Sequence, residues 1–432
     1  MLNPHPQSQP PAARPRLVVV GNGMAGIRAV EELLKIAPDL YDISVFGAEP
    51  HPNYNRILLS PVLAGEQTLD EIVLNPLSWY AGHGITLHTG ATVTAIDRAR
   101  RTVTARRVDG GTLTASYDRL ILATGSTPFI PPIPGRDLGG VIAYRDIADT
   151  ETMIAAATTY RHAVVIGGGL LGLEAANGLM KRGMQVTVVH NSARLLDRQL
   201  DETAARLLRQ ALEARGLRFA LAAQTTALVG NDDDGHGGRV RAVRLQDGRE
   251  IAAELVVIAA GIRPNTALAQ QAGLLCDHGG RGGVVVSDTM QTVTDARIWA
   301  VGECASHRGV AYGLVAPLYE QGRALAAQLA QTSLGRYGGS QVSTKLKVTG
   351  IDLFSAGNFA GGEDCDEIVL SDPLDGVYKK LVIQDDRLVG ACLYGDTADG
   401  AWYFRLIRDA QPIGPIRDHL MFGERATDAT PA

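Results

Sequence analysis

Two glycine-rich segments constrain this chain more than any other feature of its sequence. They read VVVGNGMAGIRAV at 18–30 and VVIGGGLLGLEAANGL at 164–179, and each has a G-x-G-x-x-G pattern directly after an apolar run. The pattern predicts a strand that turns into a helix, with a turn whose backbone can approach a pyrophosphate. The turns begin at Gly21 and Gly167, 146 residues apart, which leaves room for one domain between them. We therefore expect two Rossmann-like domains, each binding one dinucleotide.

The residues that follow each turn differ in charge. Glu49 stands 23 residues after Gly26, and we place it at the end of the next strand, where a carboxylate accepts hydrogen bonds from a ribose. At the equivalent place after the second turn the chain has His190, and Arg194 follows. Neither side chain repels a 2′-phosphate, so this pattern predicts weak discrimination between NADH and NADPH.

The order of the segments predicts an α/β chain with the second Rossmann-like domain inserted in the first, and a small α+β domain at the C-terminus. The proline-dense PFIPPIPG suits a stiff connection between domains, and ELVVIAAGIRPN repeats the pattern of RLILATGSTP and returns the chain to the first domain. The expected divisions are a disordered tail at 1–14, a first domain at 15–126 and 263–331, a second at 127–262 and a third at 332–432.

Composition excludes several classes of partner. The net charge is −5 and 20% of the residues are charged, which gives no basic surface for nucleic acid or an anionic membrane. Apolar runs such as LVVIAAGI at 255–262 fall far short of the ~20 residues that span a bilayer. We expect a cytoplasmic protein.

The cysteines are too few and too scattered to carry the chemistry. There are four, Cys276, Cys304, Cys365 and Cys392, and none are close in sequence. This spacing argues against a disulfide framework, a thiol redox pair and a cysteine-ligated metal. Two dinucleotide sites without a thiol pair favour a relay, in which a nicotinamide coenzyme at one site gives hydride to a flavin at the other.

Two further segments carry a family resemblance. LILATGS and IWAVGECA resemble FAD signatures of the flavoprotein pyridine nucleotide-disulfide oxidoreductase superfamily, and the match covers about 16–330. The resemblance implies FAD in the first domain and NAD(P)H in the second. It also implies that Thr124 and Gly125 lie beside the flavin and that Glu303, where most members have Asp, bonds the ribityl chain.

Glu174 is the one catalytic candidate. We expect it in the first turn of the second glycine-rich helix, where it either complements the helix dipole or lies near the meeting point of the cofactors. HPNYNRILLSPVLAG resembles the PYxRxxLS segment of rubredoxin and ferredoxin reductases, which implies that Arg56 lines the FAD site. By the same resemblance, ferredoxin reductases of the oxygenase systems usually have a lysine directly after LS that pairs with the glutamate. Pro61 stands here instead, so Glu174 is expected to lack that partner.

The C-terminal part narrows the function. STKLKVTGIDLFSAG, YKKLVIQDDRLVGACLYGDTADG and GLVAPLYEQ resemble the flavoprotein half of the NAD(P)H nitrite reductase large subunit and the electron-transfer subunit of assimilatory nitrate reductase. The resemblance implies an electron-input component whose redox partner is a nitrate or nitrite reductase catalytic polypeptide. A sirohaem centre then belongs to another chain, since this one ends at MFGERATDATPA.

Two alternatives stay open. One is an NAD(P)H reductase for a rubredoxin- or ferredoxin-like carrier, and the other is a non-catalytic flavin- and nucleotide-binding sensor. A homodimer is one arrangement open to each. We expect no metal ligand, and the residues expected to bind the cofactors are Gly21, Gly23, Met24, Ala25, Gly26, Glu49, Arg56, Val93, Thr124, Gly125, Gly167, Gly169, Leu170, Leu171, Gly172, His190, Arg194, Gly261, Gly302 and Glu303.

Overall fold

A computed structural model describes residues 13–231, 238–277, 279, 282–332, 335–346, 348 and 350–428. Most of the expected tail, residues 1–12, lies outside this range, as do residues 232–237 of the polar loop after 230. The chain forms two compact units. Unit 1 contains the chain up to Tyr54, Val73–Ser126 and Pro264–Ser340, and unit 2 contains Asn55–Ile72, Thr127–Arg263 and the chain from Gln341.

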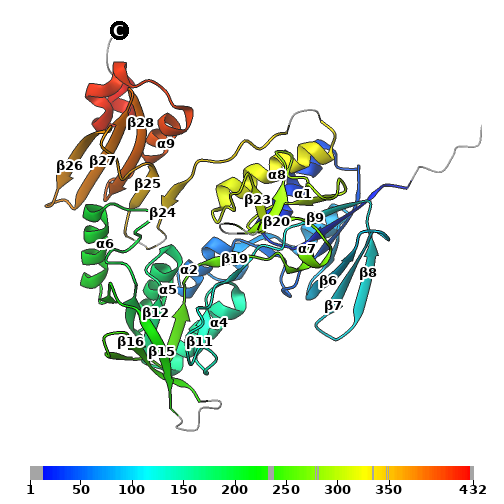
Figure 1. The fold of residues 1–432 in the computed structure, drawn as a ribbon, viewed down its shortest axis with the longest axis horizontal. Helices are drawn as coiled ribbons and strands as arrows, with labels where there is room; N and C mark the ends of the chain where they lie inside the picture. Colours follow the sequence, from blue (N-terminus) through cyan, green and yellow to red (C-terminus); the bar gives the residue numbers. More distant parts are fainter. Residues whose placement is uncertain are drawn as a thin grey trace, which may run out of the picture. The chain divides into compact units, whose positions relative to one another are not determined.

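Unit 1 is built on a five-stranded parallel sheet in the order β22-β9-β1-β2-β5. Figure 1 labels β9 of this sheet and helices α1 and α8 of the same unit. Its strands are β1 (Arg16–Val20), β2 (Asp42–Phe46), β5 (Thr86–His88), β9 (Arg119–Leu122) and β22 (Ile298–Ala300). Its helices are α1 (Met24–Ile36), α3 (Leu77–Gly82), α7 (Ala267–Gln271) and α8 (Val315–Leu329). Smaller sheets use β3 (Asn53–Tyr54), β4 (Val73–Asn75), β6 (Ala91–Asp97), β7 (Thr102–Arg107), β8 (Thr112–Ser116), β20 (Cys276–Asp277), β21 (Gly283–Val286) and β23 (Ala305–His307).

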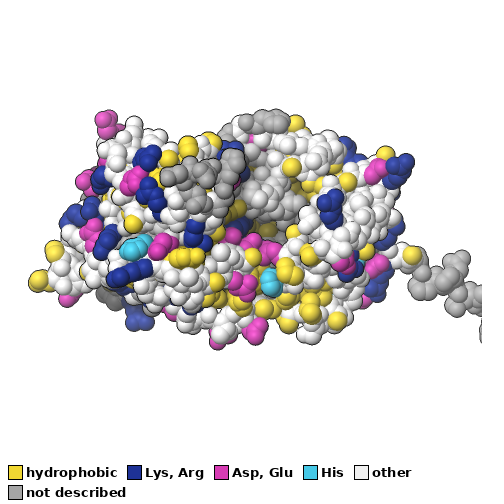
Figure 2. Space-filling model, turned by 90° about the horizontal axis from the view of Figure 1, so that it is seen from below, with side chains coloured by type: hydrophobic (Ala, Val, Ile, Leu, Met, Phe, Trp, Pro, Cys, Tyr) yellow, Lys and Arg dark blue, Asp and Glu magenta, His cyan; other side chains and the backbone are white. Residues whose placement is uncertain are grey.

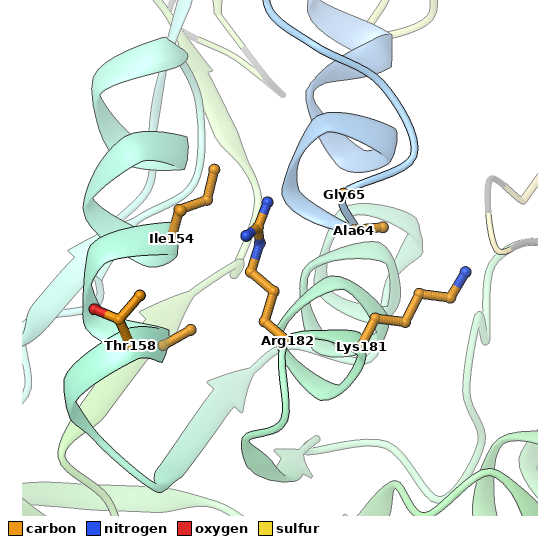
Figure 3. Close-up of a pocket in the computed structure, with 7 residues that line it drawn as sticks. Ala64, Gly65, Ile154, Thr158, Lys181 and Arg182 are labelled. Carbon is orange, nitrogen blue, oxygen red and sulfur yellow. The ribbon is translucent and has the colours of Figure 1, made fainter.

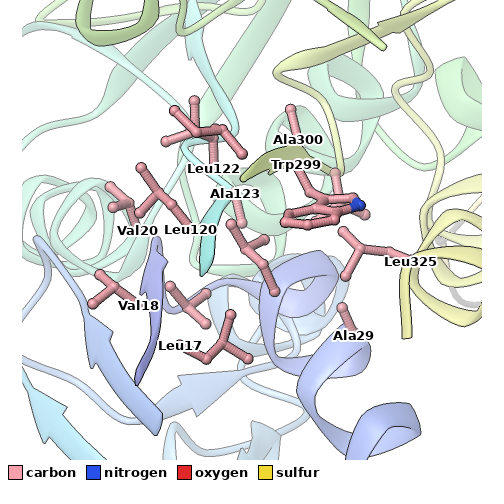
Figure 4. Packing of buried hydrophobic residues seen from close by; sticks show 14 of the residues in the cluster. Leu17, Val18, Val20, Ala29, Leu120, Leu122, Ala123, Trp299, Ala300 and Leu325 are labelled. Carbon is pink, nitrogen blue, oxygen red and sulfur yellow. The ribbon is translucent and has the colours of Figure 1, made fainter. Parts of the chain in front are cut away.

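The central strands of unit 1 are apolar on both faces because helices cover the sheet. Leu17 and Val18 on β1 and Leu120 on β9 are almost fully buried, as is typical of a parallel sheet. The apolar positions of α1 repeat at helical spacing, so one face of α1 packs on this core while Ala29 lies near Leu325 of α8 (Figure 4).

Unit 2 repeats this plan with a second five-stranded parallel sheet, in the order β11-β18-β12-β13-β14. Its strands are β11 (Val141–Ala143), β12 (His162–Ile166), β13 (Gln185–Val189), β14 (Arg218–Ala220) and β18 (Leu255–Ile258). The helices are α2 (Leu59–Leu63), α4 (Ile147–Thr159), α5 (Leu170–Lys181) and α6 (Glu202–Ala214), with short 3₁₀ turns η1 (Arg56–Leu58) and η2 (Asp70–Ile72). A small sheet joins β15 (Thr225–Gly230), β16 (Val240–Leu245) and β17 (Glu250–Ala252), and β10 (Ser126–Pro128) pairs with β19 (Ile262–Pro264).

The C-terminal part of unit 2 is an antiparallel sheet with its own core. Its strands run in the order β24-β25-β28-β27-β26, and Trp402, Tyr403 and Leu406 of α9 pack on it. The elements are β24 (Ser343–Lys345), β25 (Leu353–Gly357), β26 (Asp366–Asp372), β27 (Val377–Gln384), β28 (Arg387–Tyr394), α9 (Gly400–Asp409), η3 (Gly414–Phe422) and α10 (Glu424–Asp428).

The predicted fold class is therefore confirmed: two parallel-sheet, Rossmann-like layers and an α+β C-terminal part. The residue boundaries of the three domains stay a prediction, and the two units differ from them in grouping both Asn55–Ile72 and the chain from Gln341 with unit 2. No helix within the described residues is long and apolar enough to cross a membrane. Figure 2 shows Lys and Arg side chains intermingled with Asp and Glu on one face.

Candidate functional site

The first glycine-rich turn lies at the carboxyl edge of the sheet in unit 1. Because β1, β9 and β22 are parallel neighbours, the residues that follow them meet at this edge. They are the turn at 21–26, Thr124 with Gly125, and Gly302 with Glu303. Glu49 follows β2 at the same edge, but it lies three residues beyond the last strand residue, Phe46, and so does not close the strand as expected.

The three glycines of this turn differ in the space around them. Gly21 has φ +114°, and a Cβ there would lie 2.1 Å from the carbonyl oxygen of Ala123. A Cβ on Gly26 would lie 2.8 Å from the Cβ of Ala123, so both outer glycines permit close packing of turn and strand. A Cβ on Gly23 would have no heavy atom within 4 Å. The middle glycine therefore borders open space that the phosphates of a ligand can enter.

Side-chain contacts join the other segments of this edge. Thr124 donates from its hydroxyl to the carbonyl of Asn265 at 2.9 Å, and Asn265 donates from its amide to the carbonyl of Thr124 at 2.8 Å. Glu303 accepts from the Ser126 hydroxyl at 2.8 Å. Asn265 was not predicted, and the RPN triplet after Gly261 gives no pattern that would have marked it.

Three further contacts place predicted residues. A Cβ on Gly302 would lie 2.8 Å from that of Ala25, so the two segments touch. Glu49 accepts from the Tyr54 hydroxyl at 2.7 Å, and Val93 is buried on β6. Arg56 lies in unit 2, where its Nη1 donates to the carbonyl of Arg145 at 2.7 Å. The expectation that Arg56 lines the FAD site stays a prediction.

The second glycine-rich turn occupies the matching edge of the sheet in unit 2. The turn at 167–172 follows β12, His190 follows β13, Gly261 comes after β18 and Tyr144 follows β11. These strands are all parallel, so their carboxyl ends share one edge. This edge therefore gathers the second set of predicted residues, together with a tyrosine that was not predicted.

The second turn reproduces the geometry of the first. Gly167 has φ +126°, and its Cβ would lie 2.3 Å from the carbonyl oxygen of Ala259. A Cβ on Gly172 would lie 2.0 Å from the carbonyl oxygen of Gly167, whereas one on Gly169 would have nothing within 4 Å.

Both turns also leave a helix N-terminus open. Met24 and Ala25 begin α1, and Leu170 and Leu171 begin α5; neither helix has a side-chain cap or an acidic residue in its first turn. The first backbone N–H groups of each helix are thus directed to a site without a competing carboxylate, which suits an anionic pyrophosphate.

His190 packs tightly against the second turn. A Cβ on Gly168 would lie 2.8 Å from the imidazole, and the side chain of His190 is 13% exposed. Burial lowers the pKa of His190, and Asp197, 4.0 Å away, opposes that shift. The imidazole is therefore neutral at pH 7, and Arg194 and Arg198 are exposed cations of this loop.

Glu174 lies just beyond the first turn of its helix, not within it as the sequence predicts. α5 begins at Leu170 and has no acidic residue in its first turn, so a role as a dipole-complementing charge at the helix start is wrong. Glu174 is 8% exposed and accepts a hydrogen bond from the Ser60 hydroxyl at 2.7 Å. Ser60 stands within the quoted LS segment, but its role depends on a contact between residues 114 positions apart.

These observations bear on whether the edges suit dinucleotides and metals. Each edge has an open turn, a free helix N-terminus and, in unit 1, a carboxylate three residues after the next strand, which together suit a dinucleotide. No cluster of three or more His, Cys, Asp or Glu side chains that could hold a metal ion occurs in the part of the chain that the structure describes.

Comparisons with known proteins give the same assignment. The family profile of pyridine nucleotide-disulphide oxidoreductases matches residues 15–357, and that of the rubredoxin NAD⁺ reductase C-terminal domain matches residues 343–411. A nitrite reductase [NAD(P)H] of Bacillus subtilis is 50% identical over 92% of this chain and 48% of its own. An assimilatory nitrate reductase electron transfer subunit of the same organism is 49% identical over 89% of this chain and 48% of its own.

Among solved structures, that of a covalent putidaredoxin reductase–putidaredoxin complex is similar with a TM-score of 0.80 and 28% identity, over 97% of this chain and 100% of that one. The chain spans about half the length of the two Bacillus proteins. A profile that matches most of the chain, together with two glycine-rich turns in one architecture, shows that the chain belongs to the pyridine nucleotide-disulphide oxidoreductase family.

Proposed function

We propose that this chain is an FAD-dependent NAD(P)H oxidoreductase that serves as the electron-input component of an assimilatory nitrate or nitrite reductase. The observation that carries the proposal is the pair of sheet edges, each with a middle glycine that borders open space. The 50% identity to a nitrite reductase and the 49% identity to a nitrate reductase electron transfer subunit supply the physiological context.

In this proposal the edge in unit 1 holds FAD. The turn around Gly23 receives the pyrophosphate at the start of α1, and Glu49 accepts hydrogen bonds from the ribose. Glu303, held by the Ser126 hydroxyl at 2.8 Å, bonds the ribityl chain. When bound, FAD accepts a hydride and releases electrons onward.

The edge in unit 2 holds NAD(P)H. The turn around Gly169 receives its pyrophosphate, and the loop with His190 and Arg194 faces its ribose. Glu174, buried on α5, contributes a fixed negative charge that favours an oxidised, positively charged nicotinamide over a reduced, neutral one. We propose Glu174 as the catalytic residue on this ground.

The partner is a separate redox centre, and we propose a nitrate or nitrite reductase catalytic polypeptide in the cytoplasm. A rubredoxin- or ferredoxin-like carrier is the second candidate, and the match of residues 343–411 to the rubredoxin NAD⁺ reductase C-terminal domain favours it. A homodimer remains a prediction, which light scattering of the purified protein will check.

The test is anaerobic reduction followed by electron delivery. The purified chain should carry about one FAD, show no iron–sulfur absorption and be bleached by NADH or NADPH. The reduced protein is then mixed in turn with a nitrite reductase catalytic polypeptide, a rubredoxin and a ferredoxin. Fastest reoxidation by the first supports the main proposal, whereas fastest reoxidation by a small carrier supports the second. A chain without FAD, or one whose FAD is not reduced by either coenzyme, contradicts both.

A further inference from the structure

Helix α2 packs along its length against α5, the helix that carries Glu174. Gly178 gives the clearance between them, since a Cβ there would lie 2.7 Å from the Cγ of Leu63. Where both helices end, Arg182 donates to the carbonyl oxygens of Leu63 and Val62, the second at 3.1 Å. The first bond gives a donor to the Leu63 carbonyl at the end of α2, and the second is shared with the Gly65 N–H, which donates to the Val62 carbonyl at 3.0 Å. The two helices are therefore held at a fixed separation.

A cavity beside these contacts shows that only a few local contacts hold α2 to α5. It has a volume of about 300 Å³, and Ile154 and Thr158 of α4 line it together with the ends of α2 and α5. Figure 3 shows the Arg182 side chain rising between α4 and α2 toward the end of α2. The end of α2 is thus held against α5 by the contacts of Leu63 with Gly178 and of Arg182 with the Val62 and Leu63 carbonyls.

Ser60 stands in the first turn of α2, where this arrangement brings it to Glu174. Its hydroxyl donates to Oε2 of Glu174 at 2.7 Å, and the two residues are 4% and 8% exposed. A serine hydroxyl has a single proton, so while Ser60 donates to the Glu174 carboxylate it donates to no other acceptor. A bond of this kind fixes the carboxylate's orientation and stabilises its charged form.

Tyr144 completes the arrangement from the end of β11. Its hydroxyl donates to the Ser60 oxygen at 3.4 Å, and the residue is 1% exposed. Burial, reinforced by the nearby charge of Glu174, raises the pKa of Tyr144, while the bond with Ser60 opposes the shift. The phenol keeps its proton at all ordinary pH values. The donors therefore run in one direction, from Tyr144 to Ser60 to Glu174.

Helix packing by itself does not explain this chain of donors. Burying a carboxylate and two hydroxyls costs free energy unless each is hydrogen-bonded, and apolar side chains of the same shape would hold two helices together at no such cost. Tyr144 and the glycine-rich turn also follow strands of one parallel sheet, so both lie at the edge proposed to receive the coenzyme. The polar chain thus leads to the residue to which we assign a role in catalysis.

We propose that Ser60, supported by Tyr144, is the positioning residue of Glu174: it holds the carboxylate in one orientation and in its charged form toward the nicotinamide. Ser60 is the serine of the LS segment itself, and Pro61 stands at the next position, where the resemblance assigns a lysine. The inference rests on the proposed function, in which Glu174 acts on the nicotinamide ring.

Binding of NAD⁺ and ADP-ribose to the oxidised holoprotein tests the inference. ADP-ribose shares every part of NAD⁺ except the nicotinamide, so only NAD⁺ should respond to the charge of Glu174. Ser60→Ala should weaken NAD⁺ binding about 3- to 10-fold and leave ADP-ribose binding within about 2-fold. Ser355→Ala removes an equally buried hydroxyl from β25 and should change neither affinity.

A double-mutant cycle then shows whether Ser60 acts through Glu174. Glu174→Gln should weaken NAD⁺ at least as much as Ser60→Ala, and the double variant should be no weaker than Glu174→Gln within about 2-fold. Tyr144→Phe should give a smaller effect in the same direction that disappears in the Ser60→Ala background. If Ser60→Ala does not fold, Tyr144→Phe with Glu174→Gln forms the deciding cycle.

Three results would overturn the inference: unchanged NAD⁺ affinity in Ser60→Ala, equal losses for NAD⁺ and ADP-ribose, or additive effects in the cycle. Each of these leaves the proposed function standing if NADH or NADPH still reduces the flavin of the unaltered protein. Failure of that reduction contradicts the proposed function itself and is detected before any variant is made.

Discussion

Gly23 and Gly169 occupy the same position in two separate turns, and each borders open space at the start of a helix. A Cβ added to either would have no heavy atom within 4 Å. The glycines on both sides of them have no such freedom, because their added Cβ atoms would lie between 2.0 and 2.9 Å from neighbouring atoms. The outer glycines therefore allow each turn to fold, and the middle glycine leaves room for a ligand.

This difference leads to the first prediction. Gly169→Val should fold and retain FAD but lose at least about 100-fold in kcat/KM for NAD(P)H, because the new side chain occupies the place of the pyrophosphate. Gly23→Val should lose FAD instead. The checks are flavin absorbance per chain and stopped-flow reduction. Gly82→Val is the matched control, since its Cβ also meets nothing within 4 Å but lies in α3. Exchanged phenotypes would reverse the assignment of the two sites.

The cysteines should take no part in electron transfer. Cys276, Cys304 and Cys392 are buried, and burial raises the pKa of the Cys392 thiol to about 12, so its reactive thiolate is scarce. N-ethylmaleimide should modify only Cys365 in the native protein and all four thiols after denaturation. The rate of flavin reduction should be unchanged by this labelling and by Cys365→Ser. A labelled protein that no longer accepts electrons would require a thiol step.

Coenzyme preference should depend on pH through His190. Its pKa lies below the ordinary 6.5 because burial disfavours the charged imidazole, so it is neutral at pH 7 and gains charge only as the pH falls further. The ratio of kcat/KM for NADPH over NADH should therefore rise by about 5-fold, ~1 kcal/mol, between pH 7 and pH 5. His190→Gln should abolish the rise and His162→Gln should preserve it. A rise that persists in His190→Gln would mean that a group other than residue 190 titrates in this range and sets the preference.

Stability at low pH should reflect the pair Arg16 and Asp118 in unit 1. The carboxylate accepts from the Arg16 backbone N–H at 2.8 Å and from its guanidinium at 3.1 and 3.2 Å, which lowers the pKa of Asp118 from 3.8 to about 2. Because the pKa of Asp118 is lowered, the stabilisation of the folded state by this pair is complete well above pH 4. It is lost as the pH falls through about 2.

Asp118→Asn should therefore lower the free energy of unfolding by about 1 kcal/mol at pH 7, a value discounted for the partial exposure of the pair. The difference from the unaltered protein should narrow as the pH falls below about 4. Urea unfolding followed between pH 7 and pH 3 measures this change. Asp137→Asn, at a side chain that is 93% exposed, should show no such dependence. A constant difference over the whole range would mean that the charge of Asp118 does not contribute.

The sequence by itself determined the two turns, because their conformation is a local property of glycine. Gly21 and Gly167 adopt positive φ values that other residues rarely take, and the periodicity of the following helices fixes which face is buried. The parallel order of the strands followed from the same β-α-β pattern. Family motifs then placed the segments that gather at each edge, including Thr124 and Glu303.

Only the tertiary structure decided which side chains surround Glu174 and His190. Ser60 and Glu174 are 114 positions apart, and their contact depends on the clearance that Gly178 gives to α2. The neutral state of His190 likewise follows from its burial against Gly168, since desolvation acts on a side chain only after its neighbours are in place. Contacts and burial of this kind involve segments that are far apart in the sequence, so no local pattern of residues predicts them.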